Sequence, residues 1–158
     1  MMWRETIFKT AFSLTKYEIL LCQKINHKMD KKIISTGAIL GMIAIILGAF
    51  GAHALKKVLS MEELSTFETG VRYQMYHAFF LLFIGMINDL SKKAKKTIYN
   101  LVLFGVLLFS GSIYLLATNS LTSFDFKVIG FITPIGGLLL ILAWGVLLFH
   151  TLRHNTEK

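Results

Sequence analysis

Four apolar stretches constrain this chain more than any other feature of its sequence. They cover residues 33–54, 71–89, 97–118 and 128–149. Each has close to the ~20 residues that an α-helix needs to cross ~30 Å of hydrocarbon. Because 54% of only 158 residues are hydrophobic, a soluble core could not bury this much apolar surface. The sequence therefore predicts an all-α membrane protein with four transmembrane helices in an up-down bundle.

Lysine and arginine residues are concentrated on one side of this predicted topology. Thirteen of the 17 lie before the first stretch, in the SKKAKK segment at residues 91–96, or in the C-terminal tail. The positive-inside rule then places both termini in the cytoplasm and the chain in the bacterial cytoplasmic (plasma) membrane. Anionic lipid accounts for the net charge of +8, so we predict the lipid bilayer as a partner and no nucleic acid. A membrane protein partner or a homo-oligomer is a further alternative.

Residues 1–28 form a basic N-terminal extension ahead of a single transmembrane domain over residues 29–158. Trp3 and other apolar residues of the extension fall near one helical face, and Arg4 and other basic residues lie largely elsewhere. This pattern is typical of an amphipathic helix in the lipid headgroup region. The alternative, which we favour slightly, is a native start at Met29, where two lysines directly precede the first stretch.

A strip of small residues runs along the first stretch at spacings of three and four. This spacing places them on one side of a helix, where a neighbouring backbone can approach closely. We expect the strip to pack within the bundle rather than to form a homodimer. Its members are Gly37, Gly41, Ala44, Gly48 and Ala52.

The segment between the first two stretches carries helix signals of its own. Ser60 and Glu63 have the spacing of a capping box, and Gly70 is suited to end the short amphipathic helix that the box begins. Glu68 and Arg72 are four residues apart and are candidates for a loop ion pair. That pair would fix the loop to the start of the second stretch.

The fourth stretch opens with the sequence GFITPIGG. Pro134 inside a helix would remove a backbone donor, and Gly136 and Gly137 would soften the same turn. These three residues therefore predict a hinge or kink.

Polar side chains from all four stretches fall in the predicted extracytoplasmic half of the bundle. Such groups are costly in lipid unless they find partners, so we predict a polar pocket or a hydrogen-bonded network that faces that side. The members of this predicted polar cluster are His53, Tyr73, Gln74, His77, Ser110, Ser112, Tyr114 and Thr133.

Four sequence motifs resemble those of a known family. GAFGAHAL, TFETGVRYQMYHA, LFSGSIYLL and GFITPIGG occur in this order over residues 33–149. In order and spacing they are similar to the YgdD-like small membrane proteins (domain of unknown function 423), which have bacterial inner-membrane and mitochondrial members. The resemblance implies a four-helix membrane protein, and it carries over no activity, cofactor or catalytic residue. Family members generally begin just before the first span, so the extension departs from the pattern.

The polar cluster leaves several functions open. A satisfied network favours a structural or accessory membrane component. One alternative is a binder of a small membrane-associated ligand, a quinone, a lipid headgroup or haem, held through His53 and His77. Another is an oligomeric channel or facilitator.

Transport coupled to protons and enzymatic activity are not favoured. No carboxylate lies deep in any of the four stretches to carry protons. No motif supplies an oxyanion hole for a serine and histidine pair, so we assign no catalytic residue. We also predict no metal site and no resident cofactor.

Overall fold

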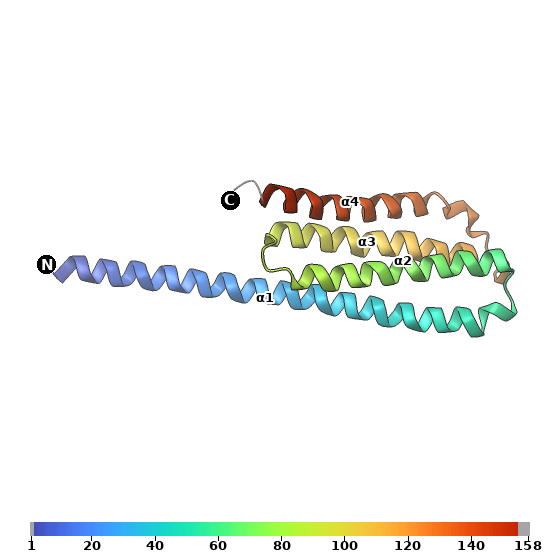
Figure 1. The fold of residues 1–158 in the computed structure, drawn as a ribbon, viewed down its shortest axis with the longest axis horizontal. Coiled ribbons are helices and arrows are strands. Elements are labelled where there is room, and N and C mark those ends of the chain that lie inside the picture. The colour runs from blue at the N-terminus through green and yellow to red at the C-terminus, as the bar shows by residue number, and fades with distance from the viewer. Residues whose placement is uncertain (1, 155–158) are drawn as a thin grey trace.

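The computed structural model describes the backbone of residues 2–154 and the side chains of residues 28–153. Every regular element in this part of the chain is helical, which confirms the all-α prediction. Short 3-10 turns lie in the connections that follow the first and the third long helix (Figure 1). The elements are α1 (Met2–His53), η1 (Leu55–Lys57), α2 (Met61–Met86), α3 (Lys92–Ala117), η2 (Asn119–Leu121), η3 (Phe126–Ile129) and α4 (Ile132–His154).

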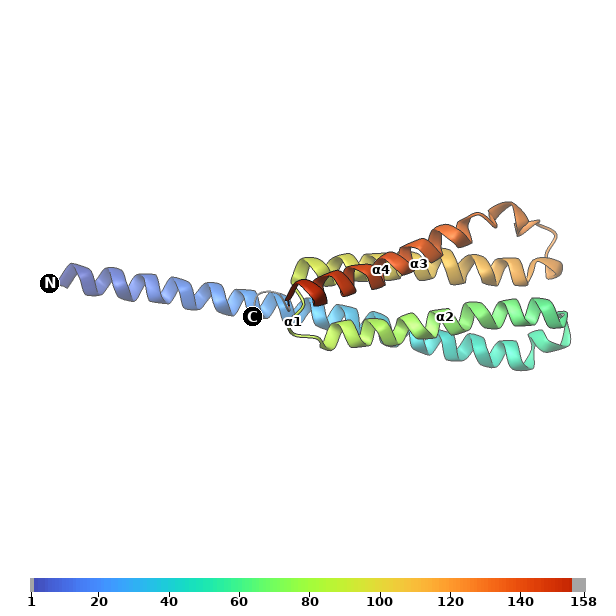
Figure 2. The same ribbon diagram turned by 45° about the horizontal axis from the view of Figure 1, so that its top comes forward.

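Successive helices run antiparallel and form two hairpins, as Figures 1 and 2 show. α1 packs mainly against α2, and α3 packs mainly against α4. The contact between α2 and α3 joins the two hairpins. Consequently α2 and α3 are the inner helices, and α1 and α4 are the outer ones.

Three helical segments of the described chain are long and apolar enough to cross a membrane: Lys28–Lys57, Lys92–Ala117 and Phe126–Arg153. α2 is not one of them, because polar residues such as Gln74 and His77 lower the hydropathy of its middle part. Length and composition therefore support three spans directly.

The N-terminal extension and the first predicted span are one helix. The backbone of α1 continues without interruption over 52 residues, and its first half projects beyond the bundle (Figure 1). The side chains before Lys28 lie outside the described residues, and so does the predicted amphipathic face of the extension.

The capping box at the start of α2 is confirmed, but two other predictions for this segment are wrong. The backbone N–H of Glu63 donates to Ser60 Oγ at 3.3 Å, and Ser60 N–H donates to Glu63 Oε2 at 2.8 Å. Gly70 does not end the helix; it is buried inside α2, where a Cβ would lie 2.7 Å from the Tyr114 ring of α3. The predicted ion pair is not formed either, because Arg72 donates to Thr69 Oγ1 at 3.0 Å rather than to a carboxylate.

The hinge predicted around Pro134 is also wrong. α4 begins at Ile132, so Pro134 lies in the first helical turn, where a backbone N–H has no intrahelical acceptor to lose. Gly136 is buried where α4 crosses α3, and a Cβ there would overlap the backbone nitrogen of Phe109. A Cβ on Gly137 would lie 3.5 Å from the Phe109 ring. Gly136 therefore serves close helix packing, whereas a Cβ on Gly137 would make only an ordinary contact.

Three glycines of the small-residue strip of α1, Gly37, Gly41 and Gly48, face α2. A Cβ on Gly37 would lie 2.9 Å from the Ala78 carbonyl oxygen, and one on Gly48 would lie 3.5 Å from a methyl group of α2. Ala44 is fully buried, and Gly41 also faces Ala78. Ala52 departs from the prediction, because it is exposed.

Two apolar cores hold the bundle together and enclose the polar part of α2. One core joins all four helices and contains Ile33, Phe80, Ile98 and Leu140. The other lies near the turn between α1 and α2 and includes Phe67. The polar residues of α2 lie between Phe67 and Phe80, so both cores flank them.

Candidate functional site

Gln74 is the centre of a hydrogen-bonded chain that joins three helices. Its Nε2 donates to the Leu40 carbonyl of α1 at 2.9 Å, and its Oε1 accepts from the Tyr114 hydroxyl of α3 at 2.9 Å. The Gln74 side chain is only 4% exposed. Since both ends of the amide are bonded, Gln74 fixes the positions of α1 and α3 on either side of α2.

A second hydrogen-bonded pair joins α3 to α4. Ser112 Oγ and Thr133 Oγ1 are 2.7 Å apart, and Ser112 Oγ also donates to the Phe109 carbonyl at 3.0 Å. A serine hydroxyl carries one hydrogen, so Thr133 is the donor in the first bond. This pair lies at the start of α4 and sets its position along α3.

His77 and Ser110 are buried with unused hydrogen-bonding capacity. His77 Nδ1 lies 2.8 Å from the Tyr73 carbonyl and must therefore carry the hydrogen, which makes Nε2 an acceptor. Neither His77 Nε2 nor Ser110 Oγ has a hydrogen-bond partner among the described residues.

The register of α2 and α3 brings these two groups to one level. Gln74 and Tyr114 bond across the antiparallel pair. One turn further along α2 is His77, and one turn back along α3 is Ser110. A hydroxyl donor and an imidazole acceptor are chemically complementary, so this level of the bundle offers both halves of a hydrogen bond.

His53 and Tyr73 lie outside the buried cluster. His53 is the last residue of α1 and is exposed. Tyr73 is 42% exposed, and its ring packs against Phe109 with centroids 4.9 Å apart. The structure therefore separates exposed His53 from buried His77. The six predicted residues other than His53 and Tyr73 form the three groups described above.

Sequence reasoning missed a buried ion pair at the opposite end of the bundle. Lys95 Nζ of α3 lies 2.6 Å from Asp30 Oδ1 of α1, and the Lys95 side chain is fully buried. The signal was present, because Lys95, Ile98 and Val102 have the three- and four-residue spacing of one buried helical face. The positive-inside rule does not reveal this burial, because it uses the lysine only as one charge of the SKKAKK segment.

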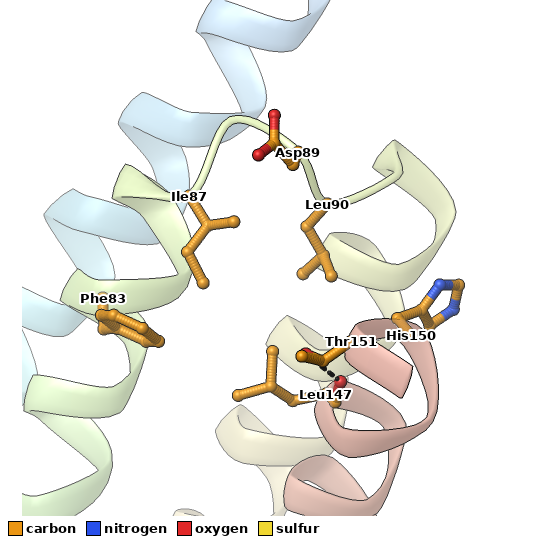
Figure 3. A pocket seen from close by; sticks show the side chains of 7 residues that line it. All are labelled: Phe83, Ile87, Asp89, Leu90, Leu147, His150 and Thr151. Atoms are coloured by element: carbon orange, nitrogen blue, oxygen red, sulfur yellow. Dashed lines mark hydrogen bonds between the residues drawn. The ribbon is translucent and has the colours of Figure 1, made fainter. Parts of the chain in front are cut away.

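A cavity of about 320 Å³ lies beside this end of the bundle (Figure 3). Ile87, Leu90 and Leu147 point toward its interior, whereas Asp89 and His150 stand at its rim with their polar atoms turned away (Figure 3). The cavity joins the end of α2 to the last turns of α4. Its interior is apolar, so it offers space for a hydrocarbon group rather than a catalytic constellation.

Apolar helices of membrane-spanning length that share hydrogen bonds among buried polar side chains define a polytopic helical membrane protein. The chain belongs to the family described as protein of unknown function (DUF423), whose model matches residues 47–137. This confirms the family resemblance of the sequence motifs.

Relatives of this family are membrane proteins of several bacteria. The chain is 42% identical over 123 residues to a UPF0382 membrane protein of Staphylococcus saprophyticus, a match that covers 78% of this chain and 98% of that protein. It is 39% identical to the UPF0382 membrane protein YwdK of Bacillus subtilis over 72% of this chain and 90% of the relative. A UPF0382 membrane protein of Haemophilus influenzae is 37% identical over 73% of this chain and 90% of its own length. No solved structure matches the chain.

Proposed function

We propose that this protein is a structural or accessory component of the bacterial plasma membrane, with four spans and both termini in the cytoplasm. One observation carries the proposal: Gln74 uses both ends of its amide to join α1, α2 and α3. Polar groups used in this way hold helices together and are not free to bind a substrate. Ser112 and Thr133 extend the same use to α4.

The packing of α2 supports its assignment as the fourth span. It lies between α1 and α3, and its polar residues Gln74 and His77 are buried against protein. Its exposed residues include Phe79, Phe83 and Met86, which suit contact with lipid. A helix with this distribution can cross the bilayer although its mean hydropathy is modest.

The surface for an accessory role would be the outer face of α1. Gly37, Gly41 and Gly48 of the small-residue strip face α2, so these positions are not open to a partner. The exposed side of α1 instead carries Ile39, Met42, Ile46 and Phe50. This face is apolar and unoccupied by the chain's other helices, which suits a membrane protein partner or a second copy.

Ligand binding is the second candidate, and the unpartnered atoms of His77 and Ser110 favour it. A membrane-soluble molecule with a hydroxyl group, such as the reduced form of a quinone, would satisfy both atoms, because the hydroxyl can donate to His77 Nε2 and accept from Ser110 Oγ. Haem held by two histidines is not favoured, because His53 is exposed at the end of α1 whereas His77 is buried in α2.

Topology is tested by thiol labelling in a Cys22→Ser background. Asn88 and Ser123 are exposed in the loops after α2 and α3. If α2 spans the membrane, a membrane-impermeant maleimide added to whole cells labels Ser123→Cys and leaves Asn88→Cys unlabelled until the membrane is permeabilised. If α2 lies on the outer surface, the two positions exchange their behaviour, and the four-span proposal fails.

The accessory role is tested by gentle purification of the full chain from its own membrane. The expected result is protein without a small-molecule adduct in native mass spectrometry, accompanied by a stoichiometric membrane partner or a second copy. A retained small molecule that disappears in His77→Leu and persists in the matched control His53→Leu would overturn the accessory role in favour of ligand binding.

A further inference from the structure

A groove between the first turns of α3 and the last turns of α4 has a basic mouth and an apolar floor. Its volume is about 560 Å³, within the range of roughly 300–1,000 Å³ that is usual for ligand sites. Lys93 of α3 and Arg153 of α4 line one end, with His150 beside them. Leu142 and Val146 line the part that runs into the bundle.

The length of this groove matches one leaflet of a bilayer. From Arg153 back to Leu142, α4 rises by roughly 16 Å at ~1.5 Å per residue. Half of a hydrocarbon core of ~30 Å is about 15 Å. The basic mouth therefore lies at headgroup level when the apolar floor extends along the acyl chains.

Gly145 keeps the middle of the groove open. A Cβ at this position would meet no atom within 4 Å. Its neighbour Val146 contributes a side chain to the floor, and Phe149 lines the same groove one turn nearer the mouth. The space above Gly145 is thus open and lined largely by apolar side chains, which suits a hydrocarbon chain.

Charge distinguishes this groove from the neighbouring cavity. The cavity of Figure 3 has Asp89 at its rim, whereas no carboxylate of the described residues lines the groove between α3 and α4. Lys93 and Arg153 are both exposed, and neither forms an ion pair with a described residue. Two cations from different helices can contact one phosphate, and an arginine guanidinium can do so through two parallel hydrogen bonds.

We propose that this groove binds one anionic phospholipid, with its phosphate between Lys93 and Arg153 and one acyl chain over Gly145. The proposal requires the helices to cross the membrane, as argued above, but it does not depend on the accessory role. Phosphatidylglycerol combines the required charge with acyl chains and is the probe for the test.

The experiment compares two lipids that share their acyl chains and differ in headgroup charge. The full chain in detergent is titrated with dioleoyl phosphatidylglycerol or dioleoyl phosphatidylcholine, and bound lipid is counted by native mass spectrometry. A basic residue near an anionic lipid contributes roughly a five-fold factor in affinity. The double variant Lys93→Gln/Arg153→Gln should therefore lose about 25-fold in phosphatidylglycerol affinity. It should lose less for phosphatidylcholine, because the choline cation of that lipid already balances its phosphate, so the preference for phosphatidylglycerol should fall.

The matched control is Lys56→Gln/Lys57→Gln, which removes the same charge from η1 at the other end of the bundle. It should leave the lipid preference unchanged. An equal loss in both double variants would show a non-specific charge effect and overturn the proposal, as would an unchanged preference in Lys93→Gln/Arg153→Gln. The thermal stability of every variant is measured and only variants of matched stability are compared, so that a loss of lipid binding caused by misfolding is recognised.

A groove-filling variant tests the acyl-chain part. Gly145→Leu should weaken both lipids by the same factor, because it blocks the chain and leaves the basic mouth intact. Inorganic phosphate at the same concentration should not displace bound phosphatidylglycerol. Displacement by phosphate, or full binding in Gly145→Leu, would show that the headgroup charge alone is bound and that the groove takes no lipid chain.

Discussion

Removing Asp30 should destabilise the protein far more than removing its partner Lys95. The two side chains are 2.6 Å apart, and the lysine is fully buried while the aspartate keeps 17% of its side chain exposed. Asp30→Asn leaves a buried ammonium without a counter-charge, which costs about 3 kcal/mol of unfolding free energy, the lower end for a broken buried pair. Lys95→Met leaves a carboxylate that water can still reach and fills the space of the lysine stem, so we expect a cost of about 1 kcal/mol.

A double-mutant cycle measures this asymmetry. Each variant is unfolded by titration with sodium dodecyl sulfate in mixed micelles, and helix content is followed by circular dichroism. The double variant should be close to Lys95→Met alone, which gives a coupling energy of about 3 kcal/mol between the two sites. The exposed carboxylate of Asp89 at the same end of the bundle supplies the control, and Asp89→Asn should change stability by less than about 0.5 kcal/mol.

The result that refutes the reasoning is a cost for Lys95→Met equal to or greater than that for Asp30→Asn. That outcome would mean that burial of the lysine does not govern the pair. A coupling energy near zero would show that the contact between α1 and α3 is not held by this ion pair.

Three further predictions follow from the packing and capping contacts. Gly136→Ala should lower the unfolding free energy by about 1–3 kcal/mol, because its Cβ would overlap the α3 backbone. The control Gly111→Ala should be neutral or slightly stabilising, because a Cβ at this position meets no atom within 4 Å. Equal effects of the two variants on stability would contradict the close crossing of α3 and α4. Tyr114→Phe should cost about 1 kcal/mol in the same titration, because it removes the donor to the buried α2 amide, and an unchanged midpoint would exclude a structural role for that bond. Hydrogen bonds from Ser60 hold the pKa of the exposed Glu63 carboxylate below its ordinary 4.5. The ionised carboxylate therefore stabilises the fold above pH 4.5, and this stabilisation is lost as the pH falls through the lowered pKa. The difference in melting temperature between the parent and Glu63→Ala should therefore be present above pH 4.5 and vanish on acidification, and a difference that persists in acid would show that the charge is not responsible.

The helical class and most helix positions could be predicted because they depend on local sequence. Stretches of about 20 apolar residues have few alternatives to a membrane helix, since lipid offers the backbone no other partner. The capping box at Ser60 is likewise local, because its two residues are only three positions apart. The close approach of a neighbouring helix to Gly37 and Gly41 could be predicted because these two residues repeat at helical spacing.

The errors arose where a residue has more than one use and the neighbouring helix selects between them. Gly70 can end a helix or allow a close approach, and only the position of Tyr114 on α3 shows that it does the second. Pro134 can kink a helix or begin one, and the start of α4 at Ile132 decides the matter. Local sequence is the same in either case.

The candidate site shows the same division between local and tertiary information. The sequence by itself determined that polar groups such as Gln74, His77 and Ser110 lie within apolar helices, because their positions in the apolar stretches follow from counting residues. Only the tertiary structure decided that Gln74 is bonded at both ends of its amide, that His77 and Ser110 keep atoms without a partner among the described residues, and that Lys95 turns inward to Asp30. Depth in a membrane follows from distance along one helix, whereas partnership depends on the rotation of each helix against its neighbours, and that rotation is set by side-chain packing between segments far apart in the chain.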